Sequence, residues 1–184
     1  MLSARYLVGT SHFGMQILYH ILNADPDIAA ERVFAPGTDM ETILRNTGRP
    51  LFSLESRESI RRFDIIGFSL LYELNYTNIL AILYLSQISF LASERNLNYP
   101  LIIGGGPCTC NPEPVADFLD VVVIGDGEHS MAAICDACLE LKRGGASRRD
   151  LILELARRFE WAYVPALYDV DYQADGTIAG MHAS

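Results

Sequence analysis

Three loops of small or polar residues follow apolar runs of this sequence, and their residue types suit the binding of a ligand. They are Ser69-Leu70-Leu71, Gly104-Gly105-Gly106 and Gly125-Asp126-Gly127-Glu128. Glycine allows positive φ and lets a ligand come close to the main chain, and the Ser69 hydroxyl can donate or accept a hydrogen bond. The loops therefore favour a binding shelf, although such glycines are also typical of tight strand-to-helix turns that bind nothing.

Asp126 and Glu128 are the residues closest to an acid/base pair. They precede a predicted helix, so stabilisation of the helix dipole and its first N–H groups is the alternative role. No nucleophile accompanied by a base is evident, and neither a G-x-G-x-x-G motif nor a P-loop is present. A small enzyme acting on a phosphate or a nucleotide therefore ranks last among the functions, and we expect no catalytic residue in this chain.

The four cysteines form one C-x-C pair and one C-x-x-C pair, namely Cys108 with Cys110 and Cys135 with Cys138. The C-x-x-C spacing is typical of redox and metal sites. Cys135 and Cys138, however, fall on the apolar face of a predicted helix, where cysteine acts as a small hydrophobic residue. We expect both thiols to be buried and no metal to be bound.

Alternating strands and helices must position these loops. A truncated first strand is expected at 6–9, and further strands at 32–35, 51–53, 63–70, 100–103 and 120–124. Helices are expected at about 13–23, 38–44, 76–87, 89–95, 112–119, 128–142 and 148–158, with Thr38 and Glu41 as a capping box. This alternation predicts right-handed βαβ units and a parallel sheet, and ligands bind at the carboxyl ends of such strands.

The last residues break this alternation. Residues 167–172 alternate between apolar and polar, Ala174-Asp175-Gly176 is a turn signal, and 177–181 is the expected return strand. We therefore expect an α/β domain at 1–166 and a β-hairpin at 167–184 that serves as a connector.

Charge and hydropathy limit the partners. With 184 residues and a net charge of −9, the chain is a poor match for nucleic acid or an anionic membrane. It contains no apolar run near the roughly 20 residues that span a bilayer, and its first residues lack a signal-peptide layout. We expect a cytoplasmic protein.

One family shares these motifs. The S-x-L of Ser69 and Leu71, followed further on by Gly104-Gly105, resembles the flavodoxin-like cobalamin-binding domain. Longer stretches resemble the cobalamin-binding-type domain that stands in front of a radical SAM domain. These stretches are 9–20, 31–36, 67–78, 104–107, 111–114 and 124–128.

The resemblance implies a flavodoxin-like (Rossmann-type) three-layer parallel sheet, with the nucleotide tail of cobalamin between the S-x-L and G-G loops. The cofactor-binding residues that we carry over or place beside them are Thr10, Ser11, His12, Gly14, Ser69, Leu71, Tyr72, Gly104, Gly105, Gly106, Gly125, Asp126, Gly127 and Glu128. For Tyr72, contact with a neighbouring domain is the equal alternative.

The family's D-x-H-x-x-G motif, whose histidine binds the cobalt, is absent. His12 lies in the comparable loop, but no aspartate stands two residues before it, and such an aspartate normally orients a ligand histidine. Any cobalamin is therefore expected to be bound without histidine ligation.

The catalytic part of such proteins is a radical SAM domain, whose C-x-x-x-C-x-x-C motif holds a [4Fe-4S] cluster next to S-adenosylmethionine. This sequence has no such motif, so the cluster and S-adenosylmethionine are expected only in a domain downstream of the hairpin. The resemblance implies an accessory cobalamin-binding domain that is not itself an enzyme. A degenerate domain that acts as an interdomain or oligomerisation scaffold is the alternative, and a homo-oligomer is left open.

Overall fold

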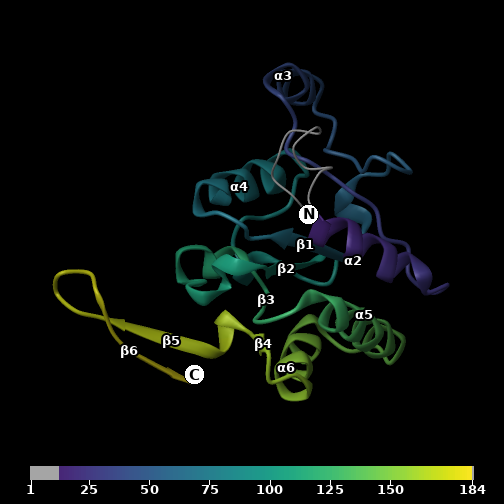
Figure 1. Ribbon diagram of the computed structural model, residues 1–184. Coiled ribbons are helices and arrows are strands. Elements are labelled where there is room, and N and C mark those ends of the chain that lie inside the picture. The colour runs from purple at the N-terminus through teal and green to yellow at the C-terminus, as the bar shows by residue number, and fades with distance from the viewer. Residues whose placement is uncertain (1–12, 184) are drawn as a thin grey trace.

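A computed structural model describes residues 13–183 and places a four-stranded sheet at the centre of the molecule (Figure 1). The strands β1 (Ile65–Ser69), β2 (Leu101–Gly105) and β3 (Val121–Val123) are parallel neighbours in that order. The fourth strand, β4 (Ala162–Tyr163), pairs antiparallel with β3. The three parallel strands therefore end at one common edge.

Helices cover both faces of this sheet. The α-helices are α2 (Phe13–Ala24), α3 (Thr38–Thr47), α4 (Tyr76–Leu85), α5 (Gly127–Arg143) and α6 (Arg148–Arg158). Helices α3 and α4 lie on one side, α5 and α6 lie on the other, and α2 lies beside α5 (Figure 1). Short 3-10 helices at Ile60–Arg62, Glu73–Asn75, Ala92–Glu94, Pro107–Cys110, Glu113–Phe118 and Pro165–Leu167 fill the connections.

Alternate strand residues supply two hydrophobic cores. Ile66 and Phe68 pack on the α4 side, whereas Ile103, Val121 and Val123 pack on the α5 side. Successive side chains of a strand point to opposite faces, so a sheet covered on both faces is built from nearly continuous apolar runs. The expected flavodoxin-like three-layer α/β fold is confirmed, with the correction that β4 is antiparallel.

A buried ion cluster fastens the amino-terminal end of this sheet. The Asp120 carboxylate accepts hydrogen bonds from the Ile102 backbone N–H at 2.7 Å and from Arg148 of α6 at 2.7 Å. Arg95 approaches the same oxygen at 3.6 Å and donates to the Phe118 carbonyl oxygen at 2.9 Å. The cluster therefore joins β2, the start of β3, α6 and the chain that leads into β2.

Several sequence expectations need correction in the segment between α2 and β1. Residues 32–35 form no strand; Val33 and Phe34 are buried, but the segment enters no ladder among residues 13–183. The expected strand at 51–53 is a single bridge between Phe52 and Ser59. Apolar residues at these places are explained by burial alone, which does not require strand pairing.

Helix ends differ in smaller ways. Gly37 is the N-cap of α3 and no side chain caps it, so the capping box of Thr38 and Glu41 does not form. The regions 89–95 and 112–119 form 3-10 turns instead of α-helix. The first strand expected at 6–9 lies outside the described residues.

The chain ends in the expected hairpin. Strands β5 (Tyr168–Tyr172) and β6 (Ile178–Ala183) pair with each other and project away from the body of the molecule (Figure 1). At its base the Tyr168 ring lies 5.3 Å from the Tyr163 ring, and the Tyr163 hydroxyl donates to Glu113 at 2.6 Å. Within the described part of the chain, no helix has the length and apolar character needed to cross a membrane.

Candidate functional site

A pocket of about 940 Å³ opens at the carboxyl ends of the parallel strands and continues between the sheet, α2 and α5. All three predicted loops contribute to its lining. The contributing loop residues are Ser69, Leu71, Gly105, Gly106, Gly125, Asp126, Gly127 and Glu128. This volume is at the upper end of the range that is usual for sites of small molecules and cofactors.

Three small residues on two neighbouring strands interrupt the floor of the pocket, which Ile65, Ile103 and Val123 also line. Gly67 and Ser69 of β1 line it, and Ser69 is in register with Gly105 of β2. Gly105 does not have a positive φ, and an added Cβ would find its nearest neighbour, Val123 Cβ, at 3.8 Å. A side chain at Gly105 would therefore fit the backbone and occupy pocket space. The Ser69 hydroxyl has no hydrogen-bond partner among the described residues.

Helix α5 supplies one wall. Met131, Cys135 and Cys138 line the pocket, and Cys138 is buried whereas Cys135 is partly exposed, which corrects the expectation that both are buried. Burial raises the pKa of the Cys135 thiol to about 11 and that of Cys138 to about 12. Both thiols are therefore neutral at pH 7, and a neutral thiol is a weak nucleophile and a weak metal ligand. With Met131 and Leu139 they form the apolar part of this wall.

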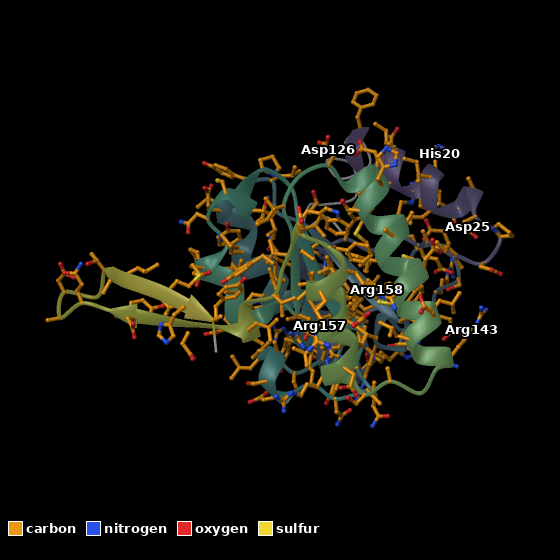
Figure 2. The ribbon with its side chains drawn as sticks, turned by 90° about the horizontal axis from the view of Figure 1, so that it is seen from below. His20, Asp25, Asp126, Arg143, Arg157 and Arg158 are labelled. Atoms are coloured by element: carbon orange, nitrogen blue, oxygen red, sulfur yellow. The ribbon has the colours of Figure 1, made fainter. Side chains whose placement is uncertain are left out.

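Helix α2 supplies the opposite wall through Met15, Leu18, Tyr19 and Leu22. The two helices meet closely at the start of α5, where a Cβ on Gly127 would lie 3.3 Å from Leu18 Cδ2. Figure 2 shows Asp126 at this end of α5 near α2, and Arg143 at the far end of the same helix. The pocket thus follows the seam between the two helices.

Charged groups lie at both ends of the seam. Asp126 is the N-cap residue of α5 but makes no side-chain cap, and Glu128 lies in the first turn. Both carboxylates line the pocket at its carboxyl edge, where the positive end of the helix dipole favours negative charge. At the other end, Lys142 donates to Asp64 at 2.6 Å. No metal-binding group of three or more His, Cys, Asp or Glu residues occurs within 13–183.

Of the other residues predicted for the site, the structure places only Gly14 in the pocket lining. Gly14 lines the pocket, but Gly104 faces the α4 side, where an added Cβ would lie 2.7 Å from Leu119 Cδ1. Tyr72 is exposed beyond the lining residues. Thr10, Ser11 and His12 lie outside the described residues. Gly104 is therefore required by packing, because the alternation of β2 turns it away from the pocket.

Gly106 has a different requirement. Its φ is +116°, and an added Cβ would lie 3.2 Å from the Leu70 carbonyl oxygen. The turn needs glycine because residues with a Cβ rarely adopt such a φ. The backbone of Leu70, just after β1, also lies too close to leave room for a side chain.

Sequence reasoning found Gly14 at the start of α2 and Gly127 and Glu128 at the start of α5, but it missed Gly67 and the rest of the two helical walls. A glycine inside a strand is a known sign of close approach by a ligand or a backbone, so Gly67 carried a usable signal. The apolar stripe of α2 was visible, but its spacing does not say which residues face a cavity. None of the described histidines lines the pocket: His20 is on α2 (Figure 2), His129 is exposed on α5 and His182 is on β6.

Comparisons with known proteins identify a family. The model of a family described as "Radical SAM proteins, N-terminal" matches residues 14–165. An uncharacterized protein of Methanocaldococcus jannaschii, MJ0966, is 32% identical over 83 residues, which make up 44% of this chain and 17% of that protein. The chain therefore corresponds to a small part of this relative's length. No solved structure matches the chain.

Proposed function

The chain belongs to the family of N-terminal regions of radical SAM proteins, and from this premise we propose that it is an accessory domain that binds cobalamin. The proposed site is the pocket at the carboxyl ends of β1, β2 and β3. The reactive face of the cofactor would point towards a radical SAM domain in the same polypeptide. That domain would carry the [4Fe-4S] cluster and S-adenosylmethionine. When bound, cobalamin supplies a cobalt centre for group-transfer or radical chemistry.

One observation carries the proposal: a large pocket whose floor has small residues, Gly67, Ser69 and Gly105, at the carboxyl ends of two neighbouring strands. Gly67 and Gly105 leave space on neighbouring strands, and Ser69 places a hydroxyl without a partner in the described chain on the same floor. A Cβ at Gly105 would reduce this space without disturbing the strand. The apolar walls on α2 and α5 suit the flat faces of an aromatic base, and Ser69 suits a polar atom of a nucleotide tail.

The cobalt is proposed to lack a protein histidine, because no histidine among residues 13–183 lines the pocket. His12, outside the described part, is tested by comparing absorption spectra of the parent and His12→Ala after mixing with cobalamin. We expect identical spectra without histidine ligation. A histidine-ligated spectrum that is lost in His12→Ala would contradict this part of the proposal.

Gly105→Val tests the site itself. The side chain would enter the pocket, so cobalamin affinity should fall at least tenfold, a change of about 1.4 kcal/mol. The free energy of unfolding should change by no more than about 1 kcal/mol, because the backbone at Gly105 suits any residue. Isothermal titration and chemical unfolding of the same samples measure both quantities.

Gly180→Val is the matched control, because Gly180 lies on β6 with open space around it and no positive φ. It should bind cobalamin as the parent does. If Gly105→Val folds and binds with parental affinity, the pocket floor is not the binding site.

A scaffold without a cofactor is the second candidate, and one observation favours it. Large apolar side chains are exposed, among them Phe13, which precedes the pocket-lining Gly14, at 77% and Leu74, in the turn after β1, at 75% of their full exposure. Such side chains are typical of a protein contact surface. A parent protein that binds no cobalamin in the titration would favour the scaffold.

A further inference from the structure

The β5–β6 hairpin has one apolar face and one polar face. Cross-strand pairing sets Tyr168 opposite Ala183, Val170 opposite Met181, and Tyr172 opposite Ile178. Directly paired residues share a face of a two-stranded sheet, and residues two apart along a strand do so too. The apolar face therefore consists of Tyr168, Val170, Tyr172, Ile178, Met181 and Ala183.

The opposite face carries Asp169, Asp171 and His182. A distance of 3.4 Å between Asp171 Oδ2 and His182 Nδ1 shows that these side chains lie together. The register shifts between Asp171 and Tyr172, and Ala179 has no partner in the ladder, so it forms a bulge. The amphipathic division of the hairpin continues past this bulge, because Tyr172 and Ile178 are paired.

The apolar face is largely uncovered in this part of the protein. Tyr172 exposes 63% of its surface, Ile178 47% and Met181 45%, and no residue of β5 or β6 is buried. An isolated two-stranded hairpin is only marginally stable in water, and stability normally requires a further layer. The base, by contrast, is held by the Tyr163–Tyr168 ring contact and by the Tyr163–Glu113 hydrogen bond.

We propose that the apolar face of this hairpin packs against the radical SAM domain of the same polypeptide and fixes the position of that domain relative to the pocket. This inference rests on the accessory-domain part of the proposed function and does not depend on cobalamin binding. The partner surface would be apolar and would face Val170 and Met181 at the centre of the hairpin. The acidic face would remain in water.

Covalent connection favours this partner over a second copy of the chain. A radical SAM domain linked on the carboxyl side of β6 would meet the hairpin at an effective concentration of the order of millimolar. The domain match also makes a linked radical SAM domain the expected neighbour. A second copy would have to reach similar concentrations in solution to compete.

Hydrogen–deuterium exchange of the full-length protein tests the contact. In the parent, amides of residues 168–183 should exchange at least about tenfold more slowly than unstructured peptide, independently of protein concentration. Val170→Asp and the milder Met181→Ser should speed exchange in the hairpin and also in one surface of the radical SAM domain. Asp169→Ser, on the polar face beside Val170, is the matched control and should change neither.

Three outcomes would overturn the inference. The first is a parental hairpin that exchanges as fast as unstructured peptide. The second is a set of variants that loosen the hairpin without changing exchange anywhere in the radical SAM domain. The third is protection that appears only at high protein concentration together with a dimer in sedimentation, which would assign the face to a second copy. A cobalamin titration of the same samples reports separately on the proposed cofactor function.

Discussion

The cysteine side chains show how burial decides chemistry at the scale of single residues. Cys135 and Cys138 line the apolar wall of the pocket, and burial is the first cause of the raised pKa of each thiol. Cys110 is exposed at the edge of the same pocket. The thiol positions alone, as a C-x-x-C pair, suggest a metal or redox site, whereas their protonation indicates a packing role.

Alkylation kinetics test this assignment. With iodoacetamide at pH 8, Cys110 should react first, because it is exposed, while Cys135 and Cys138 remain protonated and react slowly. Mass spectrometry of the peptides identifies the modified positions, and protein in denaturant is the control in which all four react. Fast modification of Cys135 in the folded protein, or stoichiometric zinc that is lost in Cys135→Ser, would contradict the assignment.

The same thiols give a pH dependence of stability. Their pKa values rise from an ordinary 9.0 to about 11 and about 12 on folding, so above pH 9 the unfolded state loses protons that the folded state keeps. The stability that the protonated thiols give the folded state is therefore fully present below pH 9. It decreases as the pH rises towards 11. Urea unfolding between pH 8 and pH 11 should show a steeper loss of stability in the parent than in Cys138→Ala.

At the scale of elements, Asp120 joins β2, the start of β3 and α6 through one buried carboxylate. Replacement by alanine would leave the buried Arg95 and the partly buried Arg148 without their carboxylate, because both lie against it at the end of the sheet. Asp120→Ala should lower the free energy of unfolding by about 3–5 kcal/mol. Chemical unfolding measures the change.

Asp117→Ala is the matched control, since Asp117 is exposed three residues earlier and should change stability by no more than about 0.5 kcal/mol. A loss below 1 kcal/mol in Asp120→Ala would show that the cluster does not hold the sheet.

Which elements the sequence predicts depends on how locally they are determined. Helix α6 occupies the predicted residues 148–158, because Ser147 and Asp150 cap its start within the segment itself. The apolar runs of β1, β2 and β3 predict these strands correctly, because each run pairs with a neighbour that is equally apolar. Residues 32–35 are also mostly apolar but enter no ladder, so composition alone wrongly predicts a strand there. Strand β4 is only two residues long, and composition does not predict it.

In the site, too, the locally determined features are the ones that the sequence predicts. The strand-end loops were visible because glycine and serine interrupt apolar runs. Which face each residue turns to depends on strand register, and this register separates Gly105 in the pocket from Gly104 in the core. The walls on α2 and α5 arise from the packing of segments distant in the chain, which no local pattern reveals.

For the whole molecule, the pocket makes α2 the element whose stability should depend most on a ligand. No residue of α2 is buried, and its inner side lines the pocket beside α5. An element with little buried apolar surface opens at low free-energy cost. In the free protein, α2 amides should therefore exchange much faster than those of β2, whose first four residues are all buried.

Cobalamin should reverse this difference if it fills the pocket. At one hundred times its Kd, a ligand that binds only the folded state stabilises it by about 2.7 kcal/mol, and contacts with the walls should slow exchange in α2 and the first turns of α5. Helix α3, with Leu44 as its one buried residue, lies on the opposite side of the sheet and is the matched comparison. Its local exchange should change much less than that of α2, because it touches neither wall. Equal slowing of α2 and α3, or an α2 already as protected as β2 without ligand, would show that cobalamin does not occupy the seam between α2 and α5.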